Sequence, residues 1–377
     1  MNQKYDIVGD IHGYATKLKE LLTKLGYSDQ DGVFRHAERK VIFLGDYIDR
    51  GPQIRETLHT VRAMVDGGSA FAVMGNHEFN ALAYATPDGK GGFLRKHTPE
   101  KVAQHQATLE QVATPYPEEW KGWLEWFATL PLFLDLGQLR AVHAAWDPEA
   151  VKAFQSIKRV DGETLRAMAD QETRLGRFRN HLLNGVELTL PEGCFFTDKA
   201  GFKRKDIRTR WWEPLAGKTY SQVVFPRSDT VPDILIPTEL AGENLTYGKD
   251  EPPVFIGHYW LPADASKQPM ALNVACLDYS VAKGGELVAY SWGDDDRDIW
   301  YGKMILTEDS FRSKPIFERW EIYRKAKEAF WAEQEDPKTT PERREDISEA
   351  LWSMCEQRLE VFYDVEELAK YYRSERV

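Results

Sequence analysis

Six side chains that can coordinate metal ions follow short apolar runs in this 377-residue chain. Their stretches read GDIHG (9–13), GDYIDRGP (45–52), GNHE (75–78), VHAAW (142–146) and IGHYW (256–260). The candidate ligands are Asp10, His12, Asp46, Asn76, His143 and His258. Carboxylate, imidazole and amide groups suit Mn, Fe or Zn, and six are enough for two divalent ions that share a bridging carboxylate. Two such ions about 3.5–4 Å apart hold a phosphoryl group and convert bound water to hydroxide near neutral pH.

The elements that must position these side chains can be predicted from hydrophobic periodicity. Apolar runs predict strands within 5–10, 40–46 and 69–76, and helical spacing over 16–27 and 55–65 predicts the helices between them. A strand–helix–strand–helix–strand order implies parallel strands joined by right-handed crossovers. The loops after the carboxyl ends of such strands form the ligand crevice. The predicted topology therefore gathers Asp10, Asp46 and Asn76 at one edge of a sheet.

The middle of the chain has two further recognisable segments. Residues 79–130 read as helical, and we expect their Trp and Phe residues to pack in the core, since they recur at helix spacing over 120–127. Residues 131–146 read as a hairpin with its turn near Gly137, and its second strand delivers His143.

The rest of the chain is predicted in four parts. Residues 147–250 have many charges and weak periodicity, and we interpret them as an insertion or cap. A strand ends at His258, and residues 271–293 read as two strands joined by a turn at Gly284-Gly285. The stretch 306–377 is charged and helical.

The full motif series resembles the calcineurin-like metallophosphoesterases of the phosphoprotein phosphatase superfamily. GDxHG, GDxxDRG and GNHE occur in that order, followed by the single His143 and Gly257-His258. The segment CLDYSVAKGGELVAY (276–290) is similar to the bacterial branch, which includes serine/threonine phosphatases and diadenosine tetraphosphatases. The resemblance implies an α/β fold, with a sandwich of two central mixed β-sheets flanked by helices. It would form a catalytic domain over 1–305, with the cap at 147–250 inside it and a C-terminal helical extension over 306–377.

The resemblance also implies how the candidate ligands are divided. Asp10 and His12 would hold one metal ion, while Asn76, His143 and His258 would hold the other. Asp46 would bridge the two ions. We expect Mn first, with Fe or Zn as alternatives that accept the same ligands.

Other residues of the motifs would act on the substrate. The family implies that His77 protonates the leaving oxygen, that Asp49 orients His77, and that Arg50 grips the phosphate oxygens. Family members usually supply a second arginine before the last histidine ligand. Arg210 is our first choice for it and Arg208 our second. Glu78 is predicted to be either a helix first-turn carboxylate or a support of the site, and Asp278 to order the site from outside the ligand set.

The predicted reaction is hydrolysis of phosphate monoesters, of a phosphoprotein or a small phosphoester, by a metal-bound hydroxide. The alternative is a dinucleoside polyphosphate hydrolase of the diadenosine tetraphosphate type, because aromatic residues of the insertion (Phe195, Phe196, Trp211, Trp212) could stack a base. A third hypothesis, a non-catalytic metal-binding interaction module, predicts lost ligands, and no ligand is missing. Nucleases of this superfamily tend to have a second histidine two residues after the Gly-His pair, where this chain has Trp260, so a phosphatase-type site is favoured.

Composition limits the partners. The net charge of −11 disfavours binding to nucleic acid and to anionic membranes. Three widely spaced cysteines form no disulfide framework, and no long apolar segment occurs, so we expect a soluble cytoplasmic protein whose oligomeric state stays open. Five histidines outside the motifs are predicted to be surface or packing residues: His36, His59, His97, His105 and His181.

Overall fold

The computed structural model describes residues 3–197, 203–240, 242, 244–263, 265, 267, 269–293 and 303–306. The chain divides into two compact units, and the one formed by 1–265 and 269–307 holds every motif. The predicted C-terminal helical extension, 306–377, lies outside the described residues except for Leu306. Leu306 is the last residue of strand β16 (Lys303–Leu306).

The first sheet is mixed and has the strand order β14-β15-β1-β4-β5, with β16 paired to β15. Its parallel half consists of β1 (Lys4–Val8), β4 (Arg39–Phe43) and β5 (Ala70–Ala72). Strand β15 (Glu286–Trp292) runs antiparallel to β1 and to β14 (Asp278–Tyr279). The three predicted parallel strands are therefore neighbours, and their carboxyl ends meet at one edge.

The second sheet is also mixed, with the order β13-β12-β7-β6. Strands β7 (Arg140–Val142), β12 (Val254–Ile256) and β13 (Val274–Cys276) are parallel, whereas β6 (Phe133–Asp135) forms the predicted hairpin with β7. Gly137, in the hairpin turn, has φ 75°, a left-handed conformation that glycine adopts without strain. The two-sheet sandwich flanked by helices is confirmed.

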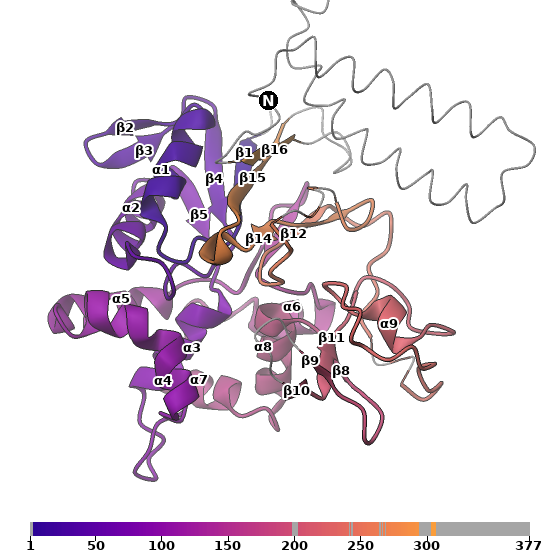
Figure 1. Cartoon of the computed structure of the whole chain (residues 1–377). Helices are drawn as coiled ribbons and strands as arrows, with labels where there is room; N and C mark the ends of the chain where they lie inside the picture. Colours follow the sequence, from indigo (N-terminus) through magenta and orange to yellow (C-terminus); the bar gives the residue numbers. More distant parts are fainter. Residues whose placement is uncertain are drawn as a thin grey trace, which may run out of the picture. The chain divides into compact units, whose positions relative to one another are not determined.

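Helices flank both sheets (Figure 1). The crossovers of the first sheet are α1 (Ala15–Lys24) and α2 (Ile54–Asp66), with the hairpin of β2 (Ser28–Gln30) and β3 (Val33–Arg35) beside them. After β5 come α3 (Asn76–Ala85), α4 (Pro99–Thr108), a π-helical turn at Leu109–Ala113, and α5 (Pro117–Phe127). The aromatic residues Trp120, Trp123 and Phe127 of α5 are buried, so their predicted role in the core is confirmed.

The segment interpreted as a cap has two parts. Helices α6 (Pro148–Phe154), α7 (Gly162–Ala169) and α8 (Arg174–Asn184) bury residues in the main core. Next come β8 (Glu187–Thr189), β9 (Phe196–Thr197), β10 (Lys203–Arg204), β11 (Asp206–Arg208) and α9 (Tyr220–Val223). Residues of 188–236 form a second, smaller hydrophobic cluster. The boundaries 147 and 250 of an insertion stay a prediction.

Three expectations were wrong in detail. The stretch 79–130 was predicted to be helical, but residues 86–98 between α3 and α4 are not. The stretch before the Gly284-Gly285 turn is two strands in different sheets: β13 pairs with β12, and after Leu277 the chain passes to the first sheet as β14. Trp211 and Trp212 are 0% and 5% exposed, so they are core residues and neither ring offers a face to a nucleobase.

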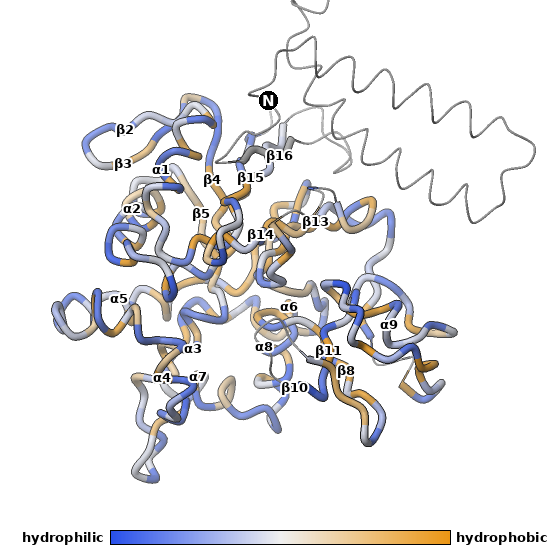
Figure 2. Tube along the Cα trace, viewed as in Figure 1, coloured by the Kyte–Doolittle hydropathy of each residue, from blue (hydrophilic) through white to orange (hydrophobic). Residues whose placement is uncertain are grey.

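The main core lies between the sheets and their helices. Residues 41–43 of β4 and Leu44, the next residue, are fully buried. Figure 2 shows hydrophobic residues concentrated along β4, β5 and β15. Burial of each large aliphatic side chain contributes about 1.5–3 kcal/mol, so the strands that carry the polar loops are held firmly. Across the described ranges, no helix combines the length and apolar character that a bilayer crossing demands.

Candidate metal centre and its surroundings

The loops after five strands converge, and their backbones adopt an unusual conformation there. Six residues from three of these loops have φ between 48° and 71°: His12, Asp46, Asp49, Arg50, His258 and Trp260. The left-handed region is rarely occupied by residues other than glycine, and such strained positions cluster at functional sites.

Neighbouring glycines allow these loops to come close together. A Cβ on Gly75 would collide with the carboxylate and the backbone N of Asp46. A Cβ on Gly257 would collide with the carboxylate of Asp10. The glycines of the GNHE and IGH motifs therefore leave room for carboxylates from other loops.

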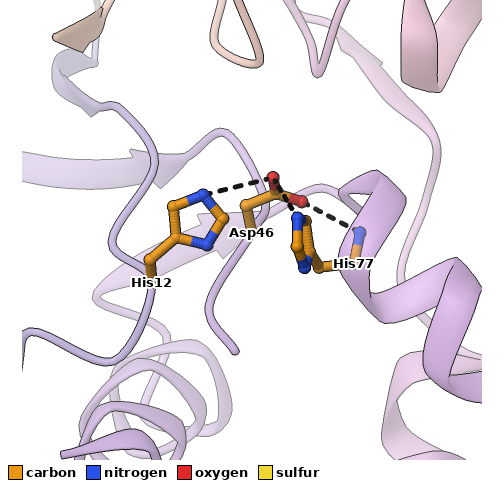
Figure 3. A group of neighbouring side chains, drawn as sticks. All are labelled: His12, Asp46 and His77. Carbon is orange, nitrogen blue, oxygen red and sulfur yellow. Dashed lines mark hydrogen bonds and ion pairs between the residues drawn. The ribbon is translucent and has the colours of Figure 1, made fainter. Parts of the chain in front are cut away.

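Asp46 lies at the centre of the site and is 1% exposed. Its Oδ1 accepts a hydrogen bond of 3.0 Å from the backbone N–H of His77, at the start of α3. The imidazole Nε2 atoms of His12 and His77 lie 3.6 and 3.8 Å from Asp46 Oδ2. Figure 3 shows both rings directed at this carboxylate, so the three side chains can surround one cation.

A second group shares the same carboxylate. His143 Nε2 lies 3.4 Å from Asp46 Oδ1, and His258 completes a set whose ligand atoms lie within 4.8 Å of one another. Asn76 Oδ1 lies 2.9 Å from His143 Nε2 and 2.9 Å from His258 Nδ1. Asp46 thus belongs to both groups, which is the arrangement that a bridging ligand requires.

Asp10 lies beside these groups without belonging to either. Its carboxylate accepts the backbone N–H of His258 at 3.0 and 3.2 Å. Burial, with Asp278 and Asp46 nearby, raises the pKa of Asp10 well above its usual range. The structure therefore brings all six predicted ligands together, with His77 rather than Asp10 in the compact group around His12.

The chemistry of these donors fits divalent cations. Nδ1 of His12 donates to the Ile48 carbonyl at 3.0 Å, which leaves Nε2 as the ligand atom. Nε2 of His12 and Nε2 of His258 are buried without a hydrogen-bond partner. Burial lowers the pKa of His12 to about 3 and that of His258 well below its usual value, so both imidazoles are neutral and can coordinate metal.

His77 is held by a chain of hydrogen bonds outside the metal ligands. Its Nδ1 lies 2.5 Å from Asp49 Oδ2, so its Nε2 faces Asp46. Burial opposes the imidazolium form, but Asp46 and Asp49 outweigh this effect and raise the pKa of His77. The other oxygen of Asp49 accepts from His105 Nδ1 at 2.8 Å and from Thr108 Oγ1 at 2.5 Å.

His105 was expected at the surface or in general packing, and the structure corrects this. It is 4% exposed and bonds directly to the carboxylate that orients His77. His105 and Thr108 are three residues apart on α4 and therefore share a face of that helix. That spacing was the available signal, but nothing in the sequence indicated that this face meets Asp49.

Glu78 fixes the two loops that carry Asp46 and Asn76. Its carboxylate accepts the backbone N–H of Gly75 and of Asp46, each at 2.9 Å, and that of Tyr47 at 2.8 Å. Glu78 is fully buried. Asp278, the first residue of β14, has a similar role, because it accepts the backbone N–H of Trp260 at 2.7 Å.

The predicted arginines lie in different surroundings. The Arg50 guanidinium carbon is 3.8 Å from the centroid of the Trp260 ring. Arg208 lies close enough to contribute to the lowered pKa of His258, second to burial. Arg210 forms an ion pair of 3.6 Å with Glu213.

Comparisons with known proteins show which proteins this chain resembles. A family model described as calcineurin-like phosphoesterase matches residues 4–214. A bis(5'-nucleosyl)-tetraphosphatase, asymmetrical type, from a Geobacillus species is 45% identical over 174 residues, which are 43% of this chain and 68% of that protein. A protein of the same name from Oceanobacillus iheyensis is 41% identical over 75 residues, or 20% of this chain and only 30% of that protein.

Among solved structures, a cold-active protein-tyrosine phosphatase from a Shewanella species aligns with a TM-score of 0.43 and 18% identity. The alignment covers 82% of this chain and 81% of that chain. The family model spans more than half of the sequence and includes five of the six predicted ligands. The chain therefore belongs to the calcineurin-like phosphoesterase family.

Proposed function

We propose that this phosphoesterase hydrolyses dinucleoside polyphosphates at a two-metal centre and cleaves the phosphate chain asymmetrically. Water would add to one phosphorus, and the bridging P–O bond to the remaining chain would break. A dinucleoside tetraphosphate would then give a nucleoside triphosphate and a nucleoside monophosphate. The observation that supports a two-metal hydrolase is that both ligand groups share the buried carboxylate of Asp46, with His77 beside it.

The residues present fit two divalent ions. Asp10, His12 and Asp46 would hold one ion, while Asp46, Asn76, His143 and His258 would hold the other. Bound there, the ions would activate water and neutralise charge on the phosphate. The choice of Mn stays a prediction.

His77 would donate a proton from Nε2 to the leaving oxygen. Its raised pKa keeps more of the imidazole protonated near neutrality, and its Nδ1 bond to Asp49 directs Nε2 into the site. Arg50 would bind the phosphoryl oxygens. We now favour Arg208 over Arg210 as the second arginine, because its charge acts on His258 while Arg210 is paired with Glu213.

The preference for nucleotides over phosphomonoesters depends on the relatives. Both relatives described above carry the name bis(5'-nucleosyl)-tetraphosphatase, and the match to the Geobacillus protein covers 68% of its length. Of the four aromatic residues first considered for base stacking, Trp211 and Trp212 are buried and give no support, whereas Phe195 is 45% exposed and Phe196 is half-buried. Hydrolysis of phosphomonoesters remains the second candidate, since the same metal centre and the same proton donor suit both bonds.

The test is a comparison of three substrates by the metal-reconstituted enzyme. We expect the highest kcat/KM with diadenosine tetraphosphate, a lower value with p-nitrophenyl phosphate, and the lowest with bis-p-nitrophenyl phosphate. ATP and AMP should appear in equal amounts. His77→Asn should reduce kcat about 10²–10⁴-fold, as loss of a general acid does.

Three results would contradict the proposal. Two molecules of ADP as product would refute asymmetrical cleavage. Turnover of p-nitrophenyl phosphate without turnover of the dinucleotide would favour the monoester candidate. Full activity after removal of metals with a chelator would exclude the two-metal centre, whereas recovery with Mn²⁺, Fe²⁺ or Zn²⁺ in turn would identify the ion that the site uses.

A further inference from the structure

Trp260 lies at the border of the metal centre and carries two cations over its ring. The Arg50 guanidinium carbon is 3.8 Å from the ring centroid, and Lys283 Nζ is 4.3 Å from it. The Trp260 ring also lies 6.3 Å from the His12 ring, centroid to centroid, which places it beside the proposed metal ligands. Both distances to the cations are well within the range of a cation–π contact, about 6 Å.

The backbone holds this arrangement in place. Trp260 has φ 53°, a strained conformation for a non-glycine residue. Buried Asp278 accepts the N–H of Trp260 at 2.7 Å and that of Ser280 at 3.0 Å. Ser280 Oγ donates to the Leu261 carbonyl at 2.7 Å. The segment with Trp260 and the 3-10 turn with Lys283 (η2, Val281–Lys283) are thus tied together.

Neither cation forms an ion pair of its own. Within the part of the chain that the structure describes, no carboxylate lies at ion-pair distance from Arg50 or Lys283, although Asp46, Asp49, Asp278 and Asp10 act on Arg50 from farther away. Because both lie close to one ring, they are within about one Debye length (~8 Å) of each other at physiological salt. Two like charges held this near to one another without an ion pair are stabilised by an anion that spans them.

We propose that Arg50, Trp260 and Lys283 form a subsite for the part of the phosphate chain beyond the phosphoryl group that is attacked. The inference rests on the proposed function and adds the residues that favour a polyphosphate over a monoester. Arg50 contacts the phosphate at the metal centre, and Lys283 contacts the next phosphates along the chain. Trp260 fixes the spacing of the two cations. A monoester has no second phosphate that Lys283 could contact.

The experiment measures competition by anions of different length. Inorganic tripolyphosphate and orthophosphate are tested as inhibitors of p-nitrophenyl phosphate hydrolysis, with free Mn²⁺ held constant. Lys283→Gln should raise the inhibition constant of tripolyphosphate about 5- to 10-fold more than that of orthophosphate. Lys283→Arg should restore most of the difference. Lys158→Gln, at an exposed lysine elsewhere, should change neither constant.

Trp260→Leu should also raise the inhibition constant of tripolyphosphate more than that of orthophosphate, because Lys283 is no longer held beside Arg50. Equal effects of Lys283→Gln on both anions, or no effect on either, would overturn the subsite. This readout is independent of the natural substrate. A protein that binds tripolyphosphate through Lys283 but does not cleave diadenosine tetraphosphate would refute the proposed function and leave the subsite standing.

Discussion

Glu78 offers the sharpest test of how the site is built, because one buried carboxylate accepts three backbone N–H groups from two loops. Glu78→Gln preserves the size of the side chain and removes one acceptor oxygen. In the best orientation, the amide oxygen keeps the N–H groups of Gly75 and Asp46, and its NH₂ group faces the N–H of Tyr47. At least one buried donor is then left without a partner.

The cost can be worked out from these contacts. One unsatisfied buried donor costs about 1–3 kcal/mol, and Glu78 is fully buried, so water does not replace the lost partner. Removal of the charge adds little, because burial and then Asp46 raise the pKa of Glu78 to about 7. We therefore expect Glu78→Gln to lower the free energy of unfolding by about 1–3 kcal/mol. Glu78→Ala leaves all three backbone donors without a partner and should lower it by more than twice that amount.

The affinity for metal ions should fall together with the stability of the Glu78 variants. The Tyr47 N–H and the Asp46 N–H belong to the loop that carries the shared ligand, and loss of such supporting contacts typically costs about 10–100-fold in metal affinity. Urea unfolding in the presence of chelator measures the stability, and calorimetric titration with Mn²⁺ measures the affinity. Glu125→Gln, at an exposed position of α5, is the control. If Glu78→Gln matches the wild type in both measurements, Glu78 does not hold the loops.

Two further predictions concern His105 and Asp147. His105→Ala should lower kcat about tenfold and leave KM within about twofold, because Asp49 loses the 2.8 Å bond that fixes it while the phosphate contacts remain. An equal loss of kcat in His97→Ala would contradict a specific role of His105. Asp147 is the buried N-cap of α6, and although burial raises its pKa, the bond to His181 and two backbone N–H groups lower it overall. A pKa that is lowered in the folded state contributes stability above the unfolded value of about 3.9, and this contribution is lost as the pH falls through the folded value. Asp147→Ala should therefore lower the free energy of urea unfolding by about 1 kcal/mol at pH 7 and by progressively less as the pH falls below about 3.9.

Sequence patterns predicted the parts of the fold that local periodicity determines. The helical spacing of Leu18, Leu21 and Leu22 corresponds to α1, and all three side chains are fully buried. The change of sheet at Leu277 was missed, because an apolar run has the same appearance whichever sheet its strand joins. The β2–β3 hairpin was missed as well, since β2 is exposed along its length and has no apolar alternation to reveal it.

The candidate ligands were predictable because each follows an apolar strand, and all except His143 come with a neighbouring glycine. The residues that support them were not. His105 reaches Asp49 across 56 positions of sequence, and Lys283 reaches Trp260 across a change of sheet. Such contacts depend on how helices and turns pack around the sheets, and no spacing within one segment encodes them.

The loop after β4 organises the whole site. Its Leu44 and Ile48 carbonyls accept Nδ1–H of His143 and His12 at 2.7 and 3.0 Å, so that both Nε2 atoms face Asp46 of the same loop. Asp49, one residue further on, orients His77 in the same way. One strained turn therefore supplies the shared carboxylate and also sets the tautomers of ligands from other loops. The strain is tolerable because residues 41–43 of β4 are fully buried and Glu78 accepts the backbone N–H groups of Asp46 and Tyr47 in the turn, so contacts within the fold hold the shared carboxylate in place.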